Sequence, residues 1–545
     1  MKKIINLLLL AGIIISGCKK GNIQTEPETM RAGGISAVSL ASGPPMGTFT
    51  SDKSRNLNVV YFVPNDVSPI LNYQSRLSSL MIWVQDWYKA QMTQNGYTDK
   101  TFGLFTDANR TNVKIVTIYG TKGKADYTYA GQGANNVMAE VNSYFAAHPE
   151  DKTSDHSLVI LPRYEIKADG SPTGGPFFGT GKWCFALDYE EMDIANLGKT
   201  DAVGYRFSVW FGGMVHELGH GLNLPHNCQK VSENNDPNKG MALMWAGNGT
   251  LGKSPTFLTA ADAATLNANQ IFNNDTQTYY GAVAADITKI HADYSAAKQA
   301  IVLSGRFSAA VKVNSILYYN DPNVNNEGTG GGHDYNAVTW ESKTIGTDSF
   351  YVEMPVSEFK YKDGSPYELR VKLVHENGTI NERTYNYTFV NNIPVLTFSS
   401  KNEFSKQGWS IASFSSEETS GEGAINGRAS TLIDGNASTY WHSRWKGVIA
   451  TYPHEIVVDM AAVKNLQGIS LTQRSSLQRA VKNLEILTST DGISFTSAGN
   501  YIAANSNKVQ YFDFPASKSA RYFKIIANSA YDGSQYVAIA ELGAF

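Results

Sequence analysis

The sequence has little cysteine, little charge and no long block of basic residues. Three cysteines among 545 residues cannot form a disulfide scaffold. Charged residues make up 17%, and 46 Lys and Arg against 49 Asp and Glu leave a formal net charge of −3. We therefore expect no nucleic acid partner, because such binding depends on neutralising phosphates. The chain is too long for one domain of typical size, and its 11% aromatic residues favour loop-rich β structure.

Long apolar runs are absent beyond the N-terminus, where the run Ile4–Ile15 follows two lysines. This run is too short to span a hydrocarbon core of about 30 Å as a mature helix. It ends in Ser16-Gly17-Cys18, which resembles the lipobox of a bacterial lipoprotein. The resemblance implies a signal peptide over 1–17, lipidation of Cys18 and a flexible tether over 18–48. We expect an exported lipoprotein on the outer membrane or cell surface, touching membrane only through its anchor.

Export bears on the other two cysteines, because disulfides persist outside the cytosol. Cys184 and Cys228 form a candidate disulfide, and two buried free thiols are the alternative. The sequence does not give their separation, so the compartment alone favours the bridge.

Residues 49–295 alternate strand-like and helix-like segments. Runs of β-branched residues predict strands, and apolar residues at helical spacing predict helices. The strands are expected at 56–64, 113–120 and 157–163, with an edge strand at Trp183–Tyr189, and the helices at 73–96 and 134–147. This order predicts an α/β layer with a mixed sheet.

Two all-β regions follow. Alternating runs separated by Gly, Asn and Asp turns predict a small Ig-like β-sandwich over residues 300–395. Its role stays open, with spacing as one alternative. Residues 402–545 form a second β unit with its own motifs.

The chemistry is expected at residues 216–226, which read H-E-L-G-H-G-L-N-L-P-H. On a helix, His216 and His220 lie on one face and can bind one ion, and His226 follows as a third ligand. Three imidazoles leave the fourth position of a tetrahedral zinc open for water, which is typical of a catalytic site. Glu217 beside them is placed to act as a base, so the pattern predicts amide hydrolysis by metal-activated water.

This segment resembles the extended zinc motif of the metzincin metallopeptidases. Asn223 replaces the family's glycine, and Asn is the next most tolerant residue for the left-handed turn needed there. The resemblance also implies a methionine in a turn below the metal, for which Met244 fits and Met241 competes. Ala246 stands where some members have a tyrosine ligand, so no tyrosine ligand is expected.

A second class of zinc peptidase completes its H-E-x-x-H motif with a glutamate, and some such enzymes act on mucin-type glycoproteins. Glu233 is the nearest acidic candidate, but the residues around it lack helical periodicity. The spacing of His226 favours the first class, and the second stays as the alternative.

The C-terminal region contains a characteristic series of segments, among them residues 429–443, 455–459, 481–492 and 520–525. In this order they resemble a discoidin, or F5/8 type C, domain close to family 32 carbohydrate-binding modules. The resemblance implies a jelly-roll sandwich with a glycan site at one end.

By position in that family, His442 and Arg474 match residues that hold a sugar, and Tyr531 is a looser candidate for the aromatic plate. Trp441 is expected in the core. A structural calcium is also implied, through oxygen ligands from Asp434, Asn436, Thr439 and Glu541.

The sequence thus predicts a monomeric zinc endopeptidase that hydrolyses protein or glycoprotein substrates and binds glycans through its C-terminal domain. Tethering glycan binding to the peptidase would raise its effective concentration on glycosylated protein. A catalytically silent glycan-binding adhesin is a further alternative, against which an intact Glu217 argues.

Overall fold

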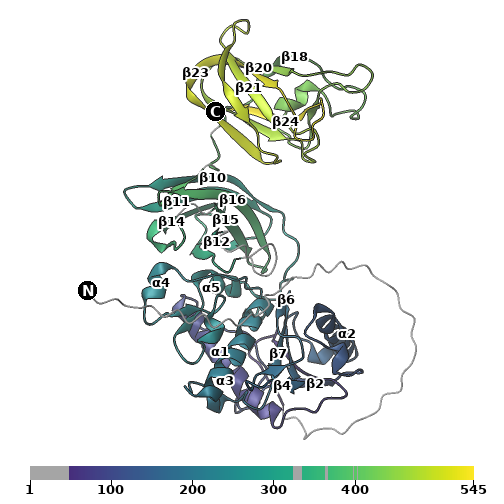
Figure 1. Cartoon of the computed structure of the whole chain (residues 1–545), viewed down its shortest axis with the longest axis vertical. Coiled ribbons are helices and arrows are strands. Elements are labelled where there is room, and N and C mark those ends of the chain that lie inside the picture. Colours follow the sequence, from purple (N-terminus) through teal and green to yellow (C-terminus); the bar gives the residue numbers. More distant parts are fainter. Residues whose placement is uncertain (1–47, 323–333, 363–365, 397, 402) are drawn as a thin grey trace. The chain divides into compact units, whose positions relative to one another are not determined.

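The computed structural model describes residues 48–322, 334–362, 366–396, 398–401 and 403–545. The chain divides into two compact units, Met1–Ser399 and Ser400–Phe545 (Figure 1). The predicted signal peptide, Cys18 and tether lie outside the described residues. In the described part of the chain, every helix is too short or too polar to span a lipid bilayer.

The first half of unit 1 is an α/β layer. Its sheet has the order β2-β1-β3-β7-β6, parallel except for β6. The strands are β1 (Asn58–Val63), β2 (Ile115–Tyr119), β3 (Ser157–Pro162), β6 (Gly179–Thr180) and β7 (Trp183–Asp188). The helices are α1 (Tyr73–Gln94), α2 (Gly131–Ala147), α3 (Ala202–Gly221), α4 (Val231–Asn235) and α5 (Ala260–Asn267). Short strand pairs join β4 (Glu165–Ile166) to β5 (Pro172–Thr173) and β8 (Met241–Ala242) to β9 (Thr256–Phe257).

Helices cover both faces of this sheet. Alternate residues of β1 point to opposite faces, so Tyr61 packs with α1 and α3 whereas Phe62 packs with α2. Every residue of β1 is buried, as expected for a parallel strand covered on both sides.

The predicted edge position of Trp183–Tyr189 is wrong. This segment forms β7, which pairs with β3 on one side and with β6 on the other. The two residues of β6 are the actual edge, and a strand this short gave no hydrophobic alternation for the sequence to reveal.

The second half of unit 1 is the expected β-sandwich, with one sheet ordered β10-β11-β14 and the other β13-β12-β15-β16-β17. Its strands are β10 (Ala285–Ser295), β11 (Ala300–Ala309), β12 (Val313–Pro322), β13 (Val338–Ser342), β14 (Ser349–Pro355), β15 (Pro366–His375), β16 (Ile380–Val390) and β17 (Ile393–Val395). The predicted boundary at residue 295 is too late, because β10 pairs with β11 and belongs to the sandwich.

The sandwich packs directly against the α/β layer. Alanines of α5 form one buried cluster with Leu317, Tyr319 and Ala337 of the sandwich. A backbone bridge also joins Cys228 to Val338. The two halves are therefore one compact unit, and a purely spacing role does not account for these contacts.

Unit 2 is all β, with strands β18 (Ser410–Phe414), β19 (Trp441–His442), β20 (His454–Gln473), β21 (Asn483–Ser489), β22 (Thr496–Ile502), β23 (Val509–Ala527) and β24 (Ala538–Ala544). The two longest strands, β20 and β23, pair along their length through two register shifts. Trp441 is fully buried, as predicted, and its indole N–H donates to the Ser416 carbonyl over 2.9 Å.

Candidate functional site

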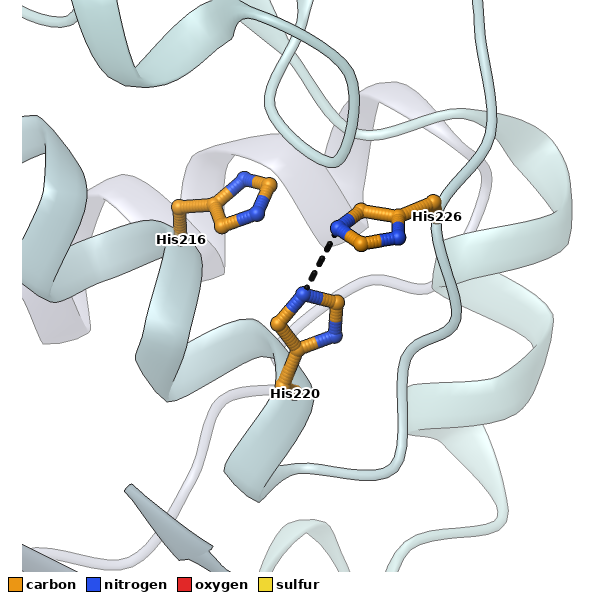
Figure 2. A group of neighbouring side chains, drawn as sticks. All are labelled: His216, His220 and His226. Atoms are coloured by element: carbon orange, nitrogen blue, oxygen red, sulfur yellow. Dashed lines mark hydrogen bonds between the residues drawn. The ribbon is translucent and has the colours of Figure 1, made fainter. Parts of the chain in front are cut away.

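The three predicted histidines come together at the C-terminal end of α3. His216 and His220 lie one turn apart on the helix, and His226 returns toward them from the loop that follows (Figure 2). One nitrogen from each lies within 4.8 Å of the others, and the Nε2 atoms of His220 and His226 are 3.0 Å apart. Among the described residues, this is the one group of three or more His, Cys, Asp or Glu side chains arranged to hold a metal ion.

The backbone orients two of these rings. His216 Nδ1 lies 2.8 Å from the Leu243 carbonyl oxygen, and His220 Nδ1 lies 2.8 Å from that of Leu224. A carbonyl accepts only from N–H, so Nδ1 carries the proton and Nε2 is left with its lone pair. Burial lowers the pKa of His216, which favours the neutral imidazole that binds metal.

The turn after α3 has the geometry expected for Asn223. Its φ is +71°, in the left-handed region that Asn tolerates better than most residues. The amide of Leu224 donates to the Gly219 carbonyl over 3.0 Å, which ends the helix and redirects the chain toward His226.

Glu217 lies beside the histidines and is only 8% exposed. Its Oε2 accepts a 2.7 Å hydrogen bond from the backbone N–H of Gly179 in β6. The edge strand therefore orients this carboxylate, although the sequence gave no sign of β6.

Met244, rather than Met241, lies under the histidine-bearing helix. A Cβ on Gly219 would be 2.5 Å from the Met244 sulfur, so the missing side chain at Gly219 lets the two segments approach. Met244 is fully buried in a tight turn in which the Trp245 amide donates to the Ala242 carbonyl over 3.1 Å. Met241 is half-buried in β8.

The alternative ligand Glu233 is not part of the cluster. It lies in α4, where the sequence predicted no helix, and its carboxylate accepts a 3.0 Å hydrogen bond from the Lys230 amide. The ammonium of Lys239 is 3.6 Å from the same carboxylate.

The predicted disulfide is wrong, because Cys184 and Cys228 are not bonded to each other. Cys184 is buried in β7 against Gly221 of α3, and burial raises the pKa of its thiol. Cys228 packs instead against the core of the sandwich and lines a cavity of about 240 Å³ where the two halves of unit 1 meet. Export alone could not show that the two thiols belong to different packing clusters.

In unit 2, the two sugar-binding candidates His442 and Arg474 approach the same carboxylate, that of Glu422. Their nearest nitrogens are each 3.8 Å from it. Tyr440 donates to Glu422 over 2.5 Å, and the Trp445 indole N–H donates to it over 2.9 Å. Sequence reasoning missed Glu422, which lies in a Gly- and Ser-rich stretch without periodicity.

The electrostatics of this cluster follow from its burial and from the Glu422 carboxylate. Burial lowers the pKa of His442, whereas burial and Glu422 raise the pKa of Tyr440 to about 12. The Arg474 guanidinium lies 4.0 Å from the Tyr440 ring centroid. Tyr531 has other contacts: its hydroxyl donates to the Ala503 carbonyl over 2.7 Å.

The predicted calcium ligands also lie together, but a lysine reaches them. Thr439 donates to Asp434 over 2.7 Å, and the Gly435 amide donates to Glu541 over 2.6 Å. The Lys406 ammonium forms an ion pair with the other oxygen of Glu541. A calcium ion would have to compete with this built-in positive charge, so the site fits calcium poorly.

Comparisons with known proteins agree with this division into units. Residues 411–542 match the F5/8 type C domain family. The chain is 39% identical over 138 residues to a sialidase from Micromonospora viridifaciens, and 28% identical over 119 residues to galactose oxidase from Gibberella zeae. These matches cover 24% and 21% of this chain but only 20% and 17% of those proteins. The similarity is therefore limited to a small part of each enzyme.

The wild-type crystal structure of OgpA from Akkermansia muciniphila is similar over a larger part of the chain. It is 32% identical, with a TM-score of 0.58, and the match covers 62% of this chain and 94% of OgpA. A catalytically inactive OgpA, solved with the O-glycopeptide substrate glycodrosocin, has the same identity and TM-score, with 93% of that chain covered.

The fold and site define a multidomain, mostly β protein that joins a histidine-cluster region to an F5/8 type C domain. The chain belongs to the family of OgpA, an enzyme whose substrate is an O-glycopeptide.

Proposed function

We propose that the protein is a zinc-dependent O-glycopeptidase that cleaves mucin-type glycoproteins. One observation carries the proposal: the cluster of His216, His220 and His226, with Glu217 beside it, in a relative of OgpA. The substrate class, mucin-type glycoproteins, is that of the glutamate-ligated alternative in the sequence analysis. The proposed zinc ligands are the three histidines of the main interpretation. The metzincin assignment and the attachment of an exported chain through Cys18 are parts of the same proposal.

The residues suit zinc, because neutral imidazoles are common ligands of this ion. When bound, zinc supplies a Lewis acid that makes water more acidic and polarises the carbonyl of the scissile bond. Glu217 takes the proton from the attacking water and delivers it to the departing amine. The Gly179 amide keeps the carboxylate in place for both transfers.

The glycan-binding part of the proposal concerns the cluster around Glu422. A carboxylate that accepts from sugar hydroxyls, a guanidinium that donates to them and aromatic faces against C–H groups are the means by which proteins hold sugars. Glu422, Arg474, Tyr440 and Trp445 bring these groups together around His442. Binding there would concentrate the peptidase on glycosylated chains.

The test uses full-length protein, its Glu217→Gln variant and two peptides that differ only in an O-linked GalNAc on one threonine. We expect the wild type to cleave the glycosylated peptide in strong preference to the other. The variant should keep its zinc and lose about 10²–10⁴-fold in rate, the usual contribution of a general base.

Each other outcome points to a different explanation. Equal cleavage of both peptides would reject the glycopeptidase assignment but keep the peptidase. Equal rates for the wild type and the variant would reject the role of Glu217. Bound zinc with no cleavage by either protein would favour a glycan-binding adhesin.

A further inference from the structure

A tyrosine from the sandwich reaches the histidine cluster. The ring of Tyr335 stacks on the imidazole of His226, with the ring centroids 3.6 Å apart and the planes 19° from parallel. Tyr335 lies three residues before β13, far along the chain from the H-E-x-x-H helix. The half of unit 1 that follows the α/β layer therefore contributes a side chain to the site.

Buried contacts within the sandwich fix the start of the segment that carries Tyr335. Asp334 has a φ of +80°, and its carboxylate pairs with Arg370 and lies 3.7 Å from the Lys372 ammonium. Asp334 and Arg370 are only 4% and 3% exposed. The Asp334 carbonyl then accepts from the Ala337 amide over 2.9 Å, which closes a turn around Tyr335.

The end of the same turn is joined to the chain just after His226. The Cys228 amide donates to the Ala337 carbonyl over 2.9 Å, and Cys228 is two residues beyond the third histidine. Ala337 also packs against α5 in the cluster shared by the two halves of unit 1. The sandwich thus fixes the start of the turn, and the chain after His226 fixes its end.

The three histidines differ in what supports them. His216 and His220 lie on one rigid helix, and carbonyls of Leu243 and Leu224 orient their rings. His226 lies in the loop beyond the helix. An aromatic ring lying flat on its imidazole restricts rotation of that ring and so helps to hold its plane.

We propose that Tyr335 is a positioning residue that sets the ring plane of the third metal ligand, so that the sandwich completes the metal site. The inference rests on the proposed function, because it takes His226 to be a zinc ligand. It predicts that the aromatic face of Tyr335 matters more than its hydroxyl.

The experiment measures zinc affinity of the full-length protein by competition with a chromogenic chelator, without substrate. Tyr335→Phe keeps the stacked ring, and we expect its zinc affinity to remain close to that of the wild type. Tyr335→Ala and Tyr335→Leu remove the ring, and both should weaken zinc binding by about 10–100-fold, the usual effect of losing a residue that orients a ligand. Tyr335→Leu keeps apolar volume, so it tests the idea if the alanine variant folds poorly.

A matched control is Tyr351→Ala, which removes an exposed tyrosine from β14 of the same sandwich. Its zinc affinity should not change. A second readout is the visible spectrum of the cobalt-substituted protein, which reports ligand geometry: it should shift in the leucine variant and stay unchanged in the phenylalanine variant.

Two results would overturn the inference. Wild-type zinc affinity in both ring-deleted variants would show that stacking does not position His226. An equal loss in Tyr335→Phe and Tyr335→Leu would assign the effect to the hydroxyl instead. If the wild type itself bound no zinc, the proposed function would fail, and this outcome is distinct from both.

Discussion

The histidine cluster of unit 1 comes from a short stretch of sequence, whereas the Glu422 cluster of unit 2 comes from a much longer one. His216, Glu217, His220 and His226 come from one helix and the loop that follows it. The residues around Glu422 come from loops and strand ends spread from 422 to 474. A site that lies on one helix and the loop after it can be inferred from residue spacing. A site assembled from separate loops depends on the fold of the whole domain that carries them.

The two clusters also differ in what balances their charges. Backbone carbonyls orient His216 and His220, and the described histidine cluster itself includes no Asp or Glu. In unit 2, Glu422 is bonded or close to each of its four polar neighbours. The first arrangement leaves imidazole lone pairs available, whereas in the second Glu422 already accepts hydrogen bonds from Tyr440 and Trp445.

The largest effect is expected from His226→Ala, which breaks the first cluster. Losing a residue that only orients a ligand weakens metal binding by about 10–100-fold. Losing a direct ligand should weaken zinc binding by more than this, and cleavage should fall to background. Metal content after dialysis and the rate of glycopeptide cleavage measure this. The exposed His148→Ala is the control. Retention of stoichiometric zinc by the variant would mean that another ligand, such as a glutamate, completes the site.

A smaller and separate effect is expected from Arg474→Ala, which breaks the second cluster. Hydrogen bonds to charged groups contribute about 1.5–3 kcal/mol, or about 10- to 100-fold in glycan affinity. Cleavage of a short glycopeptide should not change. Calorimetry with galactose-containing oligosaccharides measures binding, and Arg521→Ala, which removes an ion pair with Asp459, is the control. Unchanged glycan affinity would place the binding site elsewhere in the domain.

The smallest effect concerns the lysine that approaches the predicted calcium ligands. We expect calcium to leave the unfolding temperature of the wild type unchanged, because the Lys406 ammonium already pairs with Glu541. Lys406→Met should unfold earlier, since it leaves a buried carboxylate unpaired, and should regain stability with calcium. Calcium at 100 times its Kd would restore about 2.7 kcal/mol. Calorimetric scans with calcium or with chelator test this, and an equal response of the two proteins would contradict it.

The separation of residues along the sequence also explains which predictions were correct. The strands of the α/β layer follow from runs of β-branched residues, as in the all-buried β1. Its helices follow from apolar residues at helical spacing, as in α1. The position of β7 inside the sheet was missed, because periodicity says nothing about which strands are neighbours. The boundary before β10 was missed for the same reason, since only pairing with β11 shows where that strand belongs.

The sequence alone determined the cluster of three histidines and the carboxylate beside it. Helix geometry brings His216, Glu217 and His220 together, and the left-handed Asn223 lets the chain return with His226. Tertiary structure decided the rest: the amide of Gly179 on Glu217, the ring of Tyr335 on His226, and the separation of Cys184 from Cys228. These contacts join segments that are distant in the chain, and they form only when sheet pairing and core packing bring them together.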